Sequence, residues 1–154
     1  MKIENVEVAG TIIACGEQML VVNNIKWGAF SFSMTKLRRR QDPALGIGMH
    51  LEQPQAAAIR AAAEVLGRTL AEHELPSLLH EVKEYRQSDA DGIWKLYNLH
   101  IFQMTLPKRP AIPGAGLEIE WLTATELRNR QPVSSTVRYL LTCLEEQGKL
   151  PPWK

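Results

Sequence analysis

The chain has 154 residues, of which 45% are hydrophobic and 23% charged, a composition that predicts one folded domain with a substantial core. Its net charge of +1 provides no overall field to attract nucleic acid or an anionic membrane. No run approaches the roughly 20 apolar residues of a membrane-spanning helix, and the first ten residues lack the apolar core of a signal peptide. We therefore expect a single cytoplasmic domain over residues 1–154, with a C-terminal tail at 148–154.

The early part of the chain is rich in β-forming residues. Residues 6–15 and 19–23 are β-rich runs separated by Gly16-Glu17-Gln18, a pattern that predicts a hairpin. Residues 27–32 predict another short strand. Cys15 lies in the first run, far from Cys143 and outside any CxxC pair, so we expect two buried free thiols.

A strongly basic segment follows these strands. Four of its five residues are cationic, namely Lys36, Arg38, Arg39 and Arg40. One interpretation is a solvated loop whose charges keep the protein soluble. The other is a phosphate clamp, because Arg side chains bind phosphate oxygens in a bidentate fashion.

The sequence of residues 46–67 predicts a loop, then a helix, then a residue that terminates the helix. Pro54 suits the first helical turn, where its missing N–H would have no partner, and the alanines that follow favour a helix. Apolar residues recur at steps of three and four, which predicts one buried face. Gly67 can adopt the left-handed conformation that ends a helix. On local pattern alone, Arg60 and Glu64 would form a surface ion pair worth only about 0.2–0.5 kcal/mol.

The second half of the chain predicts further strands and two helices. A polar segment follows Gly67, a turn at 88–92 separates the two strands after it, and a Pro- and Gly-rich loop at 107–116 follows those strands. Thr123 and Glu126 form a capping box that predicts a short helix. The remaining expected elements are strands at 79–86, 93–106 and 118–122, a helix from Ser134 or Ser135 to Gly148, and a frayed tail at 150–154.

The strand at 93–106 is apolar on both faces, which predicts a central position in a sheet covered by helices. It contains His100, for which we expect a hydrogen-bonded interior position. The four histidines also lack the spacing of zinc ligands.

The spacing Gly46, five residues, Glu52, seven residues, Arg60, then Glu64 and Gly67 resembles the Nudix box. That motif is a loop-helix-loop that holds divalent metal against a diphosphate. The earlier WGAFSFSMTK segment and the later strand ending in Trp-Leu are also similar to Nudix proteins, so the resemblance covers nearly the whole chain. It implies an α/β (α+β) fold, a Nudix-like α/β/α sandwich with a mixed β-sheet between helices.

The box departs from the family pattern at three positions. Ala61 and Val65 stand where the family has glutamates, and Arg68 stands where it has an aliphatic residue. Positions 61 and 65 lie one helical turn apart, so a helix face that is anionic in the family is apolar here. Losing even a positioned general base removes roughly 10²–10⁴ in rate.

The resemblance implies roles for the residues that match. Glu64 corresponds to a metal ligand, with Mg²⁺ or Mn²⁺ as the expected ion, bound weakly if at all. Arg60 corresponds to the arginine that orients the helix carboxylates, and Glu52 to the loop glutamate that pairs with it. Lys36, Arg38, Arg39 and Arg40 are the candidate ligand-binding residues. Many Nudix proteins are dimers, so a homodimer is also an expectation.

Two questions stay open at the level of sequence. Either Lys36 marks the start of the box and residues 37–51 contain an insertion, or Gly46 is the box glycine. The function is either that of a binding or regulatory module for a nucleotide or other phosphorylated molecule, or that of an active Mg- or Mn-dependent hydrolase. An active enzyme would need relocated acidic ligands, for which the candidates are Glu118, Glu120, Asp89 and Asp91. A structural or protein-interaction role without a ligand is a third possibility.

Overall fold

The computed structural model describes residues 3–24, 28–41, 49–88, 91–111 and 118–153. Its largest element is a seven-stranded mixed sheet with the strand order β3-β2-β1-β8-β7, in which β4 pairs with β1 and β9 pairs with β2. Strands β1 and β8 are parallel, and the other pairings in this sheet are antiparallel. The strands are β1 (Glu4–Cys15), β2 (Gln18–Asn24), β3 (Ala29–Ser31), β4 (Ser33–Lys36), β7 (Ser77–Gln87), β8 (Trp94–Thr105) and β9 (Ile119–Leu122).

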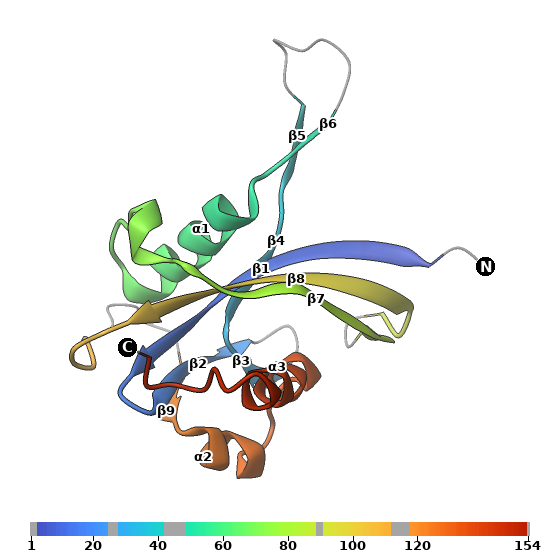
Figure 1. The fold of residues 1–154 in the computed structure, drawn as a ribbon. Coiled ribbons are helices and arrows are strands. Elements are labelled where there is room, and N and C mark those ends of the chain that lie inside the picture. The colour runs from blue at the N-terminus through green and yellow to red at the C-terminus, as the bar shows by residue number, and fades with distance from the viewer. Residues whose placement is uncertain (1–2, 25–27, 42–48, 89–90, 112–117, 154) are drawn as a thin grey trace.

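Helices cover both faces of this sheet (Figure 1). Helix α1 (Pro54–Leu66) lies against one face, whereas α2 (Ala124–Asn129) and α3 (Ser135–Glu146) lie against the other. A 3₁₀ turn, η2 (Glu72–Glu74), follows α1. This arrangement is the α/β/α sandwich expected from the sequence, and the predicted fold class is confirmed.

The side chains of β1 point alternately to the two faces of the sheet and contribute to two separate cores. Val6, Val8 and Ile12 point toward α3, whereas Ala9 and Ile13 point toward α1. Alanines at 57, 58 and 62 form the buried side of α1, and such small side chains let a helix approach a sheet closely. The apolar stripe predicted from the sequence therefore packs on one end of the long strands.

The ends of α1 follow from its sequence. Gln53 precedes the helix in an extended conformation, and Pro54 occupies the first turn. Gly67 adopts the left-handed conformation with φ 67°, and its N–H donates to the carbonyl of Ala63 at 2.8 Å. Within the described residues, no helix has the length and hydropathy needed to cross a bilayer.

The region between β4 and α1 differs from the simple loop expected before the helix. β5 (Arg39–Gln41) and β6 (Met49–Leu51) pair with each other and form an arm that projects away from the sandwich (Figure 1). Gly46, the first residue of the proposed box spacing, lies outside the described residues.

The C-terminal tail is not frayed, contrary to expectation. Pro151 is buried, and Trp153 packs against the core on the α3 side. The Trp153 indole Nε1–H also donates to the carbonyl of Lys149 at 2.8 Å. An aromatic side chain that covers apolar surface and satisfies its own N–H gains more from packing than the short tail loses in entropy.

His100 was expected in the interior and instead lies at a partly open surface. Its side chain is 37% exposed and its Nε2 lies 2.9 Å from Glu7 Oε2. The expectation failed because the face of β8 that carries His100 is covered by α1 only in part, so polar side chains on it reach solvent. The other face of β8, with Tyr97, Leu99 and Ile101, is fully buried as predicted.

Candidate functional site

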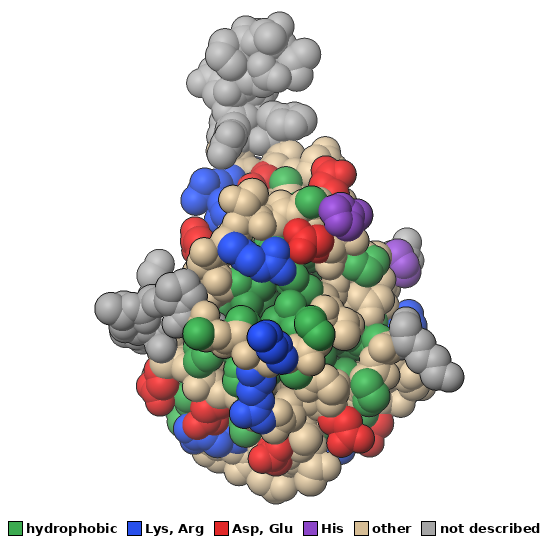
Figure 2. Space-filling view, turned by 90° about the vertical axis from the view of Figure 1, so that its left-hand side faces the viewer, with side chains coloured by type: hydrophobic (Ala, Val, Ile, Leu, Met, Phe, Trp, Pro, Cys, Tyr) green, Lys and Arg blue, Asp and Glu red, His purple; other side chains and the backbone are tan. Residues whose placement is uncertain are grey.

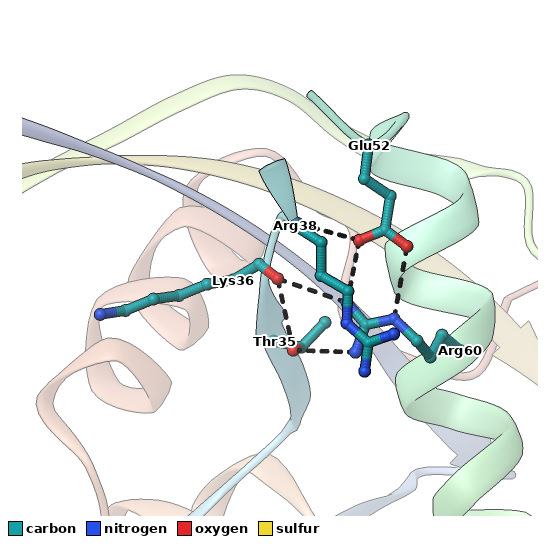
Figure 3. Close-up of polar contacts among 5 residues, drawn as sticks. All are labelled: Thr35, Lys36, Arg38, Glu52 and Arg60. Carbon is teal, nitrogen blue, oxygen red and sulfur yellow. Dashed lines mark hydrogen bonds and ion pairs between the residues drawn. The ribbon is translucent and has the colours of Figure 1, made fainter. Parts of the chain in front are cut away.

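An ion pair between Glu52 and Arg60 forms the centre of the candidate site (Figure 3). The Arg60 guanidinium donates to Glu52 through two nitrogens, at 2.9 Å from Nη2 to Oε1 and 3.3 Å from Nε to Oε2. Both side chains are largely shielded, with 21% and 12% of their surface exposed. Paired contacts of this kind fix orientation as well as adding energy. The pair therefore joins the segment before α1 to the second turn of the helix.

One contact to a side chain and one to the backbone extend this network to the neighbouring strand. Arg60 Nη2 lies 3.4 Å from the carbonyl of Lys36, and Nη1 lies 3.5 Å from the Thr35 hydroxyl. Glu52 and Arg38 are joined by two further bonds, from Arg38 N to Glu52 Oε1 and from Glu52 N to the Arg38 carbonyl. The end of β4, the base of the arm and α1 thus meet at one guanidinium. The parts played by Thr35 and by these carbonyls carried no signal in the sequence.

The electrostatics of the pair favour the ionised carboxylate. The hydrogen bond from Arg60 lowers the pKa of Glu52 below its ordinary value of 4.5, in opposition to the effect of burial, and the Arg38 N–H and the charges of both arginines act in the same direction as that bond. Glu52 is therefore a stable anion at neutral pH. A carboxylate held in this way is suited to positioning Arg60 and poorly suited to accepting a proton.

The surface ion pair between Arg60 and Glu64 suggested by local pattern does not form. Arg60 turns toward Glu52 instead, because a two-pronged, shielded partner outweighs an exposed i,i+4 contact worth about 0.2–0.5 kcal/mol. Glu64 is exposed, and no hydrogen bond or ion pair joins it to another residue of the described part of the chain.

The two positions that lack box glutamates are occupied by packed apolar side chains. Ala61 is 7% exposed and belongs to the buried side of α1. Val65 is half-buried and packs against the core beneath the helix. These residues contribute to the contact between α1 and the sheet, and neither presents an oxygen atom.

The residues present do not fit a divalent metal centre. Mg²⁺ prefers six oxygen ligands, with one or two carboxylates supplied by the protein, whereas Glu64 stands alone on its face of α1. The described ranges contain no cluster of three or more His, Cys, Asp or Glu side chains that could hold a metal ion. Thr11 and Ser33 pair across β1 and β4 and carry buried hydroxyls without hydrogen-bond partners. Neutral hydroxyls do not replace the missing carboxylates.

The basic segment is brought to this site in part. Lys36, Arg38 and Arg39 are exposed, and the guanidinium of Arg38 comes down beside that of Arg60 in Figure 3, whereas the Lys36 side chain extends away from it. The side chain of Arg40 is outside the described residues. Arg60 and Arg38 thus place two cationic side chains beside one carboxylate, an excess of positive charge that suits an anion.

The acids proposed as relocated ligands do not converge on Glu64. Glu120 is held by Arg130 through contacts of 2.7 and 2.9 Å, and Asp91 is held by Lys95 at 2.8 Å. Glu118 accepts a hydrogen bond from Asn23 at 2.9 Å. Asp89 lies outside the described residues. Each described candidate therefore already has a partner elsewhere in the fold.

Comparison with known proteins places the fold. No protein-family model matches the sequence, and no curated protein matches it either. Solved structures do match. A MutT protein from Methanosarcina mazei Go1 is similar with a TM-score of 0.67 and 11% identity, over 97% of this chain and 99% of that one. A MutT NUDIX hydrolase from Burkholderia pseudomallei has a TM-score of 0.62 and 16% identity, over 90% and 97% of the two chains.

A third similar structure is a bifunctional NMN adenylyltransferase/ADP ribose pyrophosphatase from Francisella tularensis, complexed with AMP and a manganese ion. Its TM-score is 0.66 at 15% identity, over 95% of this chain and 42% of that chain. Each of these likenesses covers at least 90% of this chain at a TM-score above 0.6. The chain therefore has the Nudix hydrolase fold.

Proposed function

We propose that this protein binds a nucleotide or another phosphorylated small molecule through a Nudix fold whose box has lost its catalytic carboxylates. The observation that carries the proposal is the contrast within α1. The Glu52–Arg60 pair that shapes the site is formed, whereas positions 61 and 65 are apolar and packed into the core. The ion pair that shapes the site is therefore present, whereas positions 61 and 65 supply no carboxylate for catalysis.

The phosphate would be bound by the cationic groups around Glu52. Arg38 and Arg39 are exposed near the base of the arm, and Arg guanidinium groups match phosphate oxygens in bidentate geometry. Arg60 is fixed by Glu52 and serves as a positioning residue. The similar Francisella protein is complexed with AMP, which supports a nucleotide as the class of ligand.

The position of Lys36 supports an insertion in the box. Its carbonyl lies directly beside the Arg60 guanidinium, and the arm formed by β5 and β6 separates it from Glu52. We therefore propose that Lys36 marks the start of the box and that the arm is the inserted segment.

A metal-dependent hydrolase is the second candidate, favoured by the manganese ion in the similar Francisella structure. Such an enzyme needs charge neutralisation on the diphosphate and a positioned, deprotonated water. Glu64 alone supplies neither in full, and the loss of a positioned base removes roughly 10²–10⁴ in rate. We propose weak or absent hydrolysis for this reason.

The test is a binding and turnover assay in the same samples. The purified chain is mixed with Mg²⁺ or Mn²⁺ and a panel of nucleotide sugars, dinucleoside polyphosphates, ADP-ribose and nucleoside triphosphates. Thermal shift reports binding, and phosphate release after phosphatase treatment reports hydrolysis. We expect a shift with at least one compound that is lost in Arg38→Ala with Arg39→Ala, and turnover near background.

Robust turnover that Glu64→Gln abolishes would overturn the proposal in favour of the hydrolase. The matched control is Glu146→Gln, since Glu146 is an exposed helical glutamate on α3, far along the chain. No shift with any compound would favour a role without a ligand.

A further inference from the structure

A pocket lies on the flank of α1 away from the Glu52–Arg60 network. It is open to solvent, has a volume of about 1040 Å³, and shares no residue with the Glu52–Arg60 network. Its floor is the face of β1, β7 and β8 that α1 leaves uncovered, and its wall is the start of α1 from Gln53 to Ala56. Figure 1 shows the three long strands continuing past the helix. Ligand pockets typically span about 300–1,000 Å³.

The two flanks of α1 are distinguished by the contacts of its side chains. Gln55 reaches toward η2, where its Nε2 donates to the carbonyls of Glu72 and Leu75 at 3.0 Å each. Arg60 reaches toward β4. Five residues correspond to about 140° around a helix of 3.6 residues per turn, so these side chains leave on different sides. The Gln55 bonds also fix the pocket wall before any ligand arrives.

Strand register gathers polar side chains on the pocket floor. Glu7 pairs with Asn98 across β1 and β8, and Asn98 pairs with Lys83 across β8 and β7, so these three form one row on the same face. His100 lies two residues further along β8, with Phe102 beyond it. All five of these side chains belong to residues that line the pocket.

Hydrogen bonds orient the centre of this floor. His100 Nε2 lies 2.9 Å from Glu7 Oε2, and Asn98 Nδ2 lies 3.4 Å from Glu7 Oε1. When the proton is on Nε2 and is donated to Glu7, the Nδ1 atom of His100 presents a lone pair. Carboxylate oxygens, the Asn98 carbonyl and this imidazole nitrogen make the floor rich in acceptors.

The charge of the lining separates this pocket from the candidate phosphate site. Among the described residues that line it, the acidic and basic groups other than histidine are Glu7, Glu72 and Lys83, so there are two carboxylates and one ammonium. The lining therefore lacks the excess of cationic groups that suits a phosphate at the Glu52–Arg60 site. A quaternary ammonium is also poorly matched, because its recognition depends on several aromatic faces, and Phe102 is the only Phe, Tyr or Trp among the described residues that line the pocket.

We propose that this pocket binds a polyhydroxylated ring, such as a monosaccharide or the sugar part of a larger molecule. Hydroxyl groups donate to Glu7 and to the imidazole, accept from the Asn98 amide, and leave the C–H face of the ring to pack on Phe102. The side-chain chemistry of the floor supplies both kinds of partner. The proposal is independent of the proposed function, because a free sugar carries no phosphate.

Titration of the ¹⁵N-labelled full-length chain with D-ribose and D-glucose, followed by amide chemical shifts, tests the proposal. We expect saturating shift changes at residues 7, 98, 100 and 102, with a dissociation constant on the order of 1–10 mM for a ligand of about ten heavy atoms. Asn98→Leu should weaken binding at least tenfold. Glu7→Gln is the second variant, and the amide spectrum itself shows whether each variant is folded.

Asn23→Leu is the matched control, because Asn23 is also a half-buried amide that donates to a glutamate, at 2.9 Å, and it does not line the pocket. It should leave the affinity within twofold of the parent. Equal weakening by Asn98→Leu and Asn23→Leu would overturn the proposal, as would saturating shifts at the same residues with putrescine or inorganic phosphate but not with either sugar. Absence of any shift at 100 mM sugar would overturn it as well.

Discussion

Arg60 holds Glu52 through two separate nitrogen–oxygen contacts, and the same guanidinium reaches the carbonyl of Lys36 on the neighbouring strand. The arginine thus connects three segments that meet only in the folded state. Such a contact contributes to stability whether or not any chemistry takes place beside it. This explains how the pair can form beside positions 61 and 65, which are apolar.

Substitution of Arg60 by Gln should lower the free energy of unfolding by about 1.5–3 kcal/mol, the range for hydrogen bonds to charged groups. The loss arises because the shielded Glu52 carboxylate is left without its main partner. Urea denaturation at pH 7 measures the effect. Arg68→Gln is the control, since Arg68 pairs with Glu74 while 46% exposed and should lose less than about 1 kcal/mol. Equal losses in the two variants would contradict the structural role of Arg60.

The contribution of Glu52 to the free energy of unfolding should disappear in acid. Arg60 lowers the pKa of Glu52 in the folded state below 4.5. At pH values between the folded-state and unfolded-state pKa, the native protein therefore binds fewer protons than the unfolded chain. Stability from this group is therefore complete above the unfolded pKa and falls as the pH drops through the folded one. The difference in unfolding free energy between the parent and Glu52→Gln should be largest at pH 7 and shrink below pH 4.5. A constant difference from pH 7 to pH 3 would contradict this origin.

Acidic residues at positions 61 and 65 should create metal affinity. The double variant Ala61→Glu with Val65→Glu places carboxylates beside Glu64, and oxygen ligands of this kind suit Mg²⁺ and Mn²⁺. Because Ala61 is 7% exposed, the unpaired acid should first lower the melting temperature. Mn²⁺ should then raise it again, by an amount that grows with metal concentration.

The matched control for this experiment is Ala61→Gln with Val65→Gln, which has the same size without the charge. It should be destabilised and should not respond to Mn²⁺. Calorimetric titration gives the affinity directly. If the double-glutamate variant binds no metal, the proposed register between the helix and the Nudix box is wrong.

Gly10 should tolerate no side chain, because β1 and β4 approach closely at this position. A Cβ atom at Gly10 would lie 2.6 Å from Met34 Cγ and 2.9 Å from the Ser33 carbonyl oxygen. Gly10→Ala should therefore cost about 1–3 kcal/mol through overpacking, as measured by urea denaturation. Met34→Ala removes the first clash and leaves the clash with the backbone. Gly10→Ala should therefore cost less stability in a Met34→Ala background than in the parent, but the loss should not vanish. An unchanged stability in Gly10→Ala would show that the two strands separate easily.

Much of the fold could be predicted because local chemistry and long-range packing agree. Helix α1 begins at Pro54 and ends before Gly67 as expected, and Thr123 and Glu126 cap α2 through reciprocal bonds. Ser134 caps α3 through its hydroxyl, which accepts a hydrogen bond from the Val137 N–H. Each of these signals acts within a few residues, so the sequence carries it directly.

The site could be predicted less completely because its geometry depends on the arm. Spacing alone identified Glu52 and Arg60, and the structure brings them together. It could not place Lys36 beside Arg60, since the contact depends on how the segment between β4 and Glu52 turns back on itself. The partly open position of His100 was missed for a similar reason, because periodicity reports alternating faces and not how far a helix extends over them.

The arm itself has a consequence for engineering. Its base is closed by reciprocal bonds between Arg38 and Glu52, and β5 and β6 pair with each other in a sheet of their own. The length of a segment closed in this manner can vary at little cost in stability, because the entropy of closing a loop changes only slowly with its length. We therefore expect that residues 39–51 can be shortened to a tight turn or replaced by a foreign sequence without a change in how α1 packs on the sheet.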